Sequence, residues 1–133
     1  SKKEITREEH FAFIEELALN KSKQFFAIYN DGGLIGVIYF TAIDWKLHEA
    51  TFGIYANLER KVRSVGNKLM TVAEYIVRKL RIYYLTLQVD AENSRAIKLY
   101  EKVGYKYEGE VVDGFFVENK YVNLIKMGLN LRR

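Results

Sequence analysis

The fold is indicated most directly by residues 90–105, which read Asp90-Ala91-Glu92-Asn93-Ser94-Arg95-Ala96-Ile97-Lys98-Leu99-Tyr100-Glu101-Lys102-Val103-Gly104-Tyr105. Asn93 is a preferred helix N-cap, because its side-chain oxygen can accept a hydrogen bond from a backbone N–H of the first turn. Gly104 stands where helices commonly end, because glycine adopts the left-handed conformation without strain. The apolar residues between them recur at helical spacing and are Ala96, Leu99, Tyr100 and Val103. Since residues 83–89 read as a strand, the sequence predicts a strand that leads into a capped helix.

A second strand, loop and helix lie upstream. Residues 50–56 read as a strand and residues 57–64 as a loop. A long helix with one apolar face follows, marked by Val65, Leu69, Val72, Ala73, Ile76, Val77 and Leu80. The loop is basic, and Gly66 allows a ligand to approach the backbone. A helix N-terminus offers unpaired N–H groups and the positive end of the helix dipole, so this loop suits a phosphate. The alternative is an ordinary solvated loop.

The remaining segments complete an α/β pattern. Residues 7–19 read as an amphipathic helix opened by the capping box Thr6-Arg7-Glu8-Glu9. Strands are predicted at 24–30 and 34–43, with a hairpin turn between them. Residues 105–129 indicate a final antiparallel pair, turning at Asp113-Gly114 or at Glu118-Asn119. The sequence therefore predicts a mixed α/β fold with a central sheet flanked by helices, in a single domain over residues 1–133.

Composition limits the classes of function. The chain has 133 residues, no cysteine, two histidines and a net charge of +4. Without cysteine there is no disulfide framework, thiol nucleophile or zinc–thiolate site, and two histidines disfavour a histidine-rich metal centre, so no metal is expected. The excess of basic residues is small and scattered among acidic ones, which argues against a nucleic-acid partner. No apolar run is long enough to cross a bilayer, so no membrane partner is expected and a cytoplasmic location fits.

Both strand–helix segments resemble one known family. Asn93-x-x-Ala96-x-x-Leu99-Tyr100-x-Lys102-x-Gly104-Tyr105 resembles the fourth-helix signature of the GCN5-related N-acetyltransferase (GNAT) superfamily. The loop Lys61-Val62-Arg63-Ser64-Val65-Gly66 is similar to its pyrophosphate-binding pattern, Arg/Gln-x-x-Gly-x-Gly/Ala. Lys61 stands where Arg or Gln is usual, and Ser64 replaces the first glycine. Serine there can still donate through its backbone and hydroxyl if its φ stays negative.

The resemblance implies a mostly antiparallel sheet of GNAT type and acetyl-coenzyme A (acetyl-CoA) as co-substrate. The family usually opens with a further strand and helix, so the domain is expected to be incomplete at its N-terminus. The pantetheine arm would lie along the strand edge Ile54-Tyr55-Ala56, where a backbone N–H would also hold the developing oxyanion. Asn93 would form hydrogen bonds with the pantetheine amides, and Ala96 would also contact the coenzyme. The pyrophosphate would contact the backbone of Lys61, Val62, Arg63, Ser64, Val65, Gly66 and Asn67.

The resemblance also assigns the chemistry. Tyr100 would act as general acid and give a proton to the sulfur of the leaving coenzyme. The acceptor amine must arrive neutral, and candidate bases are His48, Glu49 and Glu92. Trp45 and Glu49 are candidate acceptor-binding residues. Aromatic surfaces for a nucleobase are offered by Trp45, Tyr39, Phe115, Phe116 and Tyr121, which could equally be core residues.

Within the superfamily, several strings resemble the N-acetyltransferases of bacterial pseudaminic-acid biosynthesis, among them Ile35-Gly36-Val37-Ile38 and Phe52-Gly53-Ile54-Tyr55. The resemblance implies a small-molecule amine acceptor, namely the 4-amino group of a UDP-linked amino-deoxy sugar. The alternatives are a ribosomal-protein N-terminus or a polyamine as acceptor. A further alternative is a non-catalytic domain that only binds acetyl-CoA. A homodimer is a further expectation.

Overall fold

The computed structural model of the chain describes residues 2–4, 13–59 and 63–132. The chain forms two compact units, Ser1–Tyr83 and Tyr84–Arg133. Over the described residues, each unit has its own antiparallel strands and one α-helix. The single domain expected from the sequence stays a prediction.

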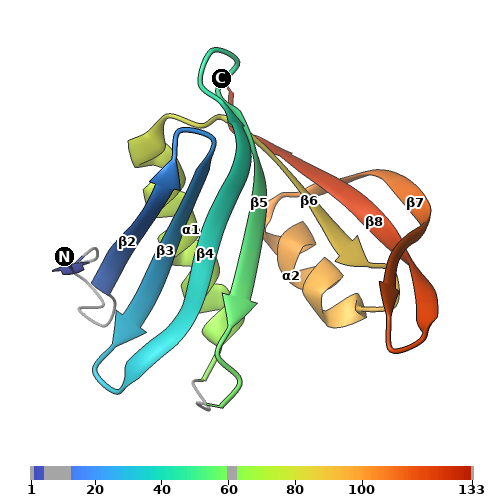
Figure 1. The fold of residues 1–133 in the computed structure, drawn as a ribbon, viewed down its shortest axis with the longest axis horizontal. Helices are drawn as coiled ribbons and strands as arrows, with labels where there is room; N and C mark the ends of the chain where they lie inside the picture. Colours follow the sequence, from blue (N-terminus) through green and yellow to red (C-terminus); the bar gives the residue numbers. More distant parts are fainter. Residues whose placement is uncertain (1, 5–12, 60–62, 133) are drawn as a thin grey trace. The chain divides into compact units, whose positions relative to one another are not determined.

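The first unit contains an antiparallel sheet in which each strand lies beside the next strand of the chain (Figure 1). Its strands are β1 (Lys2–Glu4), β2 (Phe13–Asn20), β3 (Lys23–Asn30), β4 (Gly33–Asp44) and β5 (Glu49–Ala56). The predicted strands at 24–30, 34–43 and 50–56 are therefore confirmed. The predicted turn between β3 and β4 is also present, and the Asn30 side chain accepts a hydrogen bond from the Gly32 N–H at 3.1 Å.

Helix α1 (Val65–Leu80) covers one face of this sheet (Figure 1). Its apolar stripe is confirmed, and the buried residues are Leu69, Met70, Val72, Ala73, Ile76 and Val77. Gly36 of β4 faces α1, because a Cβ added there would lie 2.8 Å from Cδ1 of Leu69. Alternate residues of a strand point to opposite faces, so Ile38 and Phe40 share the buried face with Gly36.

The helix predicted over residues 7–19 is wrong for the part that the structure describes. Residues 13–20 form strand β2, which pairs with β3 from Phe13↔Tyr29 to Asn20↔Lys23. The capping box and the rest of that prediction, up to residue 12, lie outside the described residues. Glu15, Glu16 and Leu17 are good helix formers, but the ladder with β3 supplies backbone partners along nearly all of the segment, with an irregularity between Ala18 and Asn20. Pairing with a neighbouring strand overrides local propensity here.

The second unit contains β6 (Tyr84–Asp90), helix α2 (Ser94–Val103), β7 (Lys106–Val117) and β8 (Lys120–Asn130). Strand β8 lies between β6 and β7 and is antiparallel to both. Of the two predicted turns, the structure has Glu118-Asn119, where φ is 51° and 64°. Two consecutive positive φ values match a two-residue hairpin turn that follows the twist of the strands. Asp113 and Gly114 lie inside β7, at an irregularity in its register with β8.

Candidate active site

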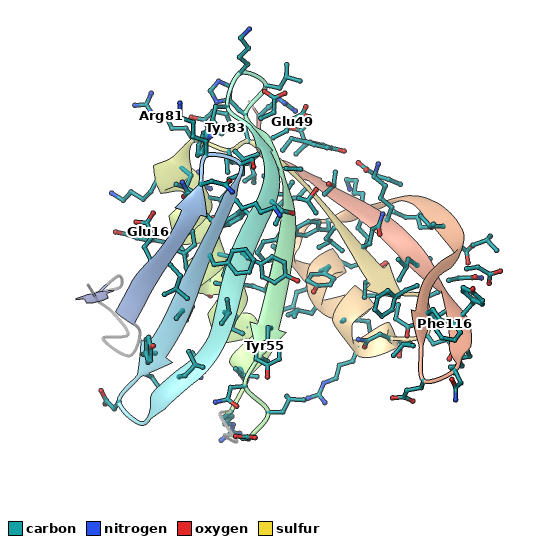
Figure 2. All side chains as sticks on the ribbon, viewed as in Figure 1. Glu16, Glu49, Tyr55, Arg81, Tyr83 and Phe116 are labelled. Atoms are coloured by element: carbon teal, nitrogen blue, oxygen red, sulfur yellow. The ribbon has the colours of Figure 1, made fainter. Side chains whose placement is uncertain are left out.

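The loop that leaves β5 is anchored by Asn57, which no pattern in the sequence marked. The Asn57 N–H donates to the carbonyl of Ile35 at 2.9 Å, and its side-chain amide donates to the carbonyl of Leu34 at 3.0 Å. Its side-chain oxygen accepts from the Glu59 N–H at 3.1 Å. Asn57 therefore fixes the start of the loop against β4. Figure 2 shows Tyr55 at the same end of β5.

Ser64 occupies the N-cap position of α1 in the left-handed conformation, with φ 55° and ψ 40°. The negative φ on which donation by a serine was made conditional is therefore not present at this residue. Its carbonyl accepts the first helical bond, from the Lys68 N–H at 3.0 Å. Its side chain makes no capping hydrogen bond within the described part of the chain. Ser64 thus adopts the conformation that glycine, the usual residue in the family pattern, adopts without strain.

The electrostatics of the α1 N-terminus favour an anion. The first turn contains no acidic residue to offset the positive end of the helix dipole. Instead, the ammonium group of Lys68 turns back and donates to the carbonyl of Arg63 at 2.8 Å. Arg63 is exposed beside it. Cations at a helix N-terminus are unfavourable unless a negative ligand binds there. Arg60, Lys61 and Val62 lie outside the described residues.

The conformation of Ser64 predicts a stability change. Replacing Ser64 with glycine should raise the free energy of unfolding by roughly 0.5–1 kcal/mol, because relief of the left-handed strain, about 1–2 kcal/mol, exceeds the entropy cost of glycine. The higher backbone entropy of glycine in the unfolded chain reduces the gain. Thermal or denaturant unfolding measures it.

Ser64→Ala is the matched control for this prediction. It also removes the hydroxyl but keeps the Cβ atom that causes the strain, so it should not stabilise the protein. Equal unfolding free energies for the glycine and alanine variants would contradict the assigned conformation.

The candidate pantetheine edge, Ile54-Tyr55-Ala56, pairs on one side with Ile38, Val37 and Gly36 of β4. Ile54 and Ala56 are half-buried, whereas Tyr55 is exposed. The segment thus has the extended backbone that a strand-like ligand needs. Its role in binding the coenzyme stays a prediction.

In the second unit, the predicted cap of α2 is confirmed. The Asn93 side-chain oxygen accepts a hydrogen bond from the Ala96 N–H at 3.1 Å. The cap therefore uses the oxygen, and the amide nitrogen of Asn93 is the group suited to donate to a ligand carbonyl. Asn93, Ala96 and Tyr100 follow one another at spacings of three and four residues, so they lie on one side of the helix.

Tyr100 is held by the turn that ends α2. Its carbonyl accepts from the N–H groups of Gly104 and Tyr105, at 3.2 and 3.0 Å, and Gly104 has the predicted positive φ of 119°. The Tyr100 and Tyr105 rings meet edge to face, with centroids 5.7 Å apart. Burial, and secondarily the neighbouring Tyr100, raises the pKa of Tyr105 far above its usual value. Tyr105 therefore stays protonated, whereas the half-buried Tyr100 is the tyrosine of this pair that a ligand can reach.

The two candidate acceptor-binding residues lie at the hairpin between β4 and β5. The Trp45 indole N–H donates to the carbonyl of Lys21 at 2.7 Å, which ties this hairpin to the turn between β2 and β3. Trp45 remains 39% exposed, so part of its side chain can contact a ligand. Glu49, labelled in Figure 2, is half-buried. It pairs in register with Asp44. Their part in acceptor binding stays a prediction.

The other candidate bases are His48 and Glu92. His48 Nδ1 lies 2.9 Å from the carbonyl of Arg81. A carbonyl only accepts, so Nδ1 carries the proton and Nε2 is the basic nitrogen. The His48 ring also packs on Tyr83, 5.3 Å between centroids. Glu92 is exposed in the turn before α2. Within residues 2–4, 13–59 and 63–132, no group of three or more acidic, histidine or cysteine side chains could hold a metal ion. No helix in the same ranges is long and apolar enough to span a membrane.

Comparison with known proteins identifies the family. The profile of the acetyltransferase (GNAT) family matches residues 2–105, which include the candidate loop, α1 and α2. The chain belongs to this family. Acetyltransferases of the family use acetyl-CoA, as the resemblance in the two motifs implied.

Two kinds of curated relative are similar to the chain. A spermidine N(1)-acetyltransferase of Escherichia coli K12 is 31% identical over 81% of this chain and 59% of its own length. An acetyltransferase PseH of Campylobacter jejuni serotype O:2 is 34% identical over 86% of this chain and 71% of its own length. The chain thus spans less than two thirds of the length of this spermidine enzyme.

Solved structures confirm the mixed, mostly antiparallel α/β fold class. The spermidine/spermine N-acetyltransferase SpeG of Vibrio cholerae superposes with a TM-score of 0.78 at 25% identity, over 84% of this chain and 67% of SpeG. Another structure, of the V. cholerae spermidine N-acetyltransferase with CoA and spermine, has a TM-score of 0.77 at 26% identity, over 84% of this chain and 67% of that one.

Proposed function

We propose that the protein transfers the acetyl group of acetyl-CoA to a primary amine of a small soluble acceptor. The observation that carries this proposal is the N-terminus of α1, which has Ser64 in a glycine-like conformation, no acid in its first turn and cations beside it. Such an end is suited to a pyrophosphate. The resemblance of the preceding loop to the pyrophosphate-binding pattern of the family adds to the argument.

Different residues bind the coenzyme, stabilise the intermediate and transfer protons. Backbone N–H groups of residues 61–67 bind the pyrophosphate, and the edge Ile54-Tyr55-Ala56 binds the pantetheine arm. The acceptor nitrogen attacks the thioester carbonyl, and a backbone N–H of the same edge stabilises the oxyanion. The C–S bond then breaks while the Tyr100 hydroxyl gives its proton to the sulfur. The surplus proton of the amine passes to a base, for which His48, Glu49 and Glu92 are candidates.

The ordinary acidity of a phenol is compatible with the role of general acid. A phenol titrates near ~10 and a thiol near ~8.5, so complete transfer to a free thiolate is uphill by roughly 2 kcal/mol. The cost is avoided if Tyr100 first donates a hydrogen bond to the sulfur and the proton moves only as the C–S bond breaks. Tyr100 therefore needs no unusual pKa to act as general acid.

We propose a UDP-linked 4-amino-deoxy sugar as the acceptor. The strings that resemble the pseudaminic-acid branch support this choice, and the chain covers more of PseH than of the spermidine enzyme. The net charge of +4 also opposes the approach of a polycation. The second candidate is a polyamine, because curated relatives at 31% identity are spermidine acetyltransferases.

A panel of acceptors tests both the acetyl transfer and the choice of acceptor. Release of free thiol from acetyl-CoA should be measured with the UDP-linked 4-amino sugar, spermidine and a peptide. The sugar should give a kcat/KM at least about tenfold above that of spermidine, the discrimination that one well-placed polar contact provides.

Two outcomes contradict different parts of the proposal. Equal or better activity on spermidine would overturn the sugar as acceptor but leave acetyl transfer intact. Binding of acetyl-CoA without thiol release for any amine would indicate a non-catalytic binding domain instead.

A further inference from the structure

One face of the first unit's sheet carries a row of side chains that the proposed mechanism does not use. The row crosses four strands in register, through the pairs Leu17↔Phe25, Phe25↔Tyr39 and Tyr39↔Gly53. Since Gly36 and Ile38 face α1, the neighbouring Tyr39 faces the opposite side of the sheet. Phe25, Tyr39 and Gly53 are half-buried there, and Leu17 is 41% exposed.

The Tyr39 ring leans from β4 over β5. A Cβ atom added to Gly53 would overlap Cε2, Cζ and the hydroxyl oxygen of Tyr39. The ring therefore fills the space that any other residue at position 53 would occupy. The ring of Phe25 stacks behind it, with centroids 4.9 Å apart and planes 12° apart. Gly53 and Phe25 together fix where the Tyr39 hydroxyl lies.

This hydroxyl lies over β5, directly before the candidate pantetheine edge. Gly53 precedes Ile54, the first residue of that edge. Within the described ranges the Tyr39 hydroxyl forms no hydrogen bond and is not fully buried, so it reaches solvent beside β5. A tyrosine hydroxyl both donates and accepts hydrogen bonds, so a ligand group that replaces water at this position can bond to it.

We infer that Tyr39 is an acceptor-positioning residue, whose hydroxyl oxygen accepts a hydrogen bond from the acceptor amine. This inference rests on the proposed function, because it places the amine beside the edge that holds the acetyl group. An N–H that donates to Tyr39 leaves the nitrogen lone pair unshared and available to attack the thioester carbonyl. Holding a nucleophile in this way lowers the entropy cost of attack. Phe25 acts through Tyr39 by holding its ring.

Tyr39→Phe tests the inference, because it keeps the stacked ring and removes only the hydroxyl. We expect kcat/KM for the amine to fall about tenfold, the usual effect of one hydrogen bond. The Kd for acetyl-CoA and the melting temperature should not change. Turnover should be measured by thiol release with the UDP-linked 4-amino sugar and with spermidine. Tyr75→Phe, on α1, is the matched control and should keep wild-type values for all three quantities.

Phe25→Leu supplies a second measurement. It should lower kcat/KM less than Tyr39→Phe does, and the double variant should be no worse than Tyr39→Phe alone, because both changes act on one contact. Losses that add would overturn the role of Phe25. A wild-type kcat/KM in Tyr39→Phe would overturn the role of Tyr39 while leaving acetyl transfer intact. A wild-type protein that releases no thiol with any amine would instead overturn the proposed function itself.

Discussion

Tyr100→Phe should lower kcat by about 10²–10⁴-fold, the usual contribution of one positioned general acid. The variant keeps the ring and its edge-to-face contact with Tyr105, and removes only the hydroxyl. The carbonyl of residue 100 still accepts from Gly104 and Tyr105, so the end of α2 should not change. The loss should therefore appear in kcat, with little change in the Kd for acetyl-CoA. Steady-state thiol release and calorimetric binding measure the two quantities.

The control for this variant is Tyr107→Phe, which removes the hydroxyl of an exposed tyrosine in the same unit. It should keep the wild-type kcat. A Tyr100→Phe enzyme with wild-type kcat would contradict the role of Tyr100, whereas a large loss of acetyl-CoA affinity would show that the hydroxyl serves binding instead. The buried Tyr105 is a poor substitute acid, since its raised pKa keeps the proton on its hydroxyl.

The helices of the described chain were predictable because their signals are local. The stripe of α1 and the Asn93 and Gly104 caps of α2 each depend on residues within a few positions of one another. Strand β2 was not predictable in this way. Its segment has helical propensity, and its strand conformation depends on pairing with β3. Propensity gives only a weak preference, which such pairing overrides.

In the candidate site, too, local features were predictable and features that depend on distant segments were not. The motif identified Ser64, but not its left-handed backbone, since few non-glycine residues adopt that conformation. The contact of Tyr39 with Gly53 depends on the register between β4 and β5, and a shift of one residue would move Tyr39 to the other face. Asn57 was missed because its partners belong to β4, more than twenty residues earlier in the chain. The features that the motifs did not predict therefore depend on contacts between segments that are distant in the sequence.

Gly66→Val should weaken acetyl-CoA binding by roughly tenfold to a hundredfold, because a branched side chain in the first turn of α1 would keep the pyrophosphate from the backbone. That range corresponds to the loss of one hydrogen bond to a charged group, about 1.5–3 kcal/mol. Gly66 is the second residue of the helix, where valine is a better helix former than glycine. The melting temperature should therefore stay the same or rise, which separates loss of binding from loss of folding.

Thr71→Val is the control for Gly66→Val, since it places the same side chain at an exposed position farther along α1. It removes only the bond from the Thr71 hydroxyl to the carbonyl of Asn67, so acetyl-CoA affinity should stay within about twofold of wild type. Calorimetry at two salt concentrations adds a second criterion. An anion held by Arg63, Lys68 and the helix dipole should bind more weakly as salt rises. Unchanged affinity in a folded Gly66→Val protein would show that the pyrophosphate binds elsewhere, and the α1 N-terminus would lose its proposed role.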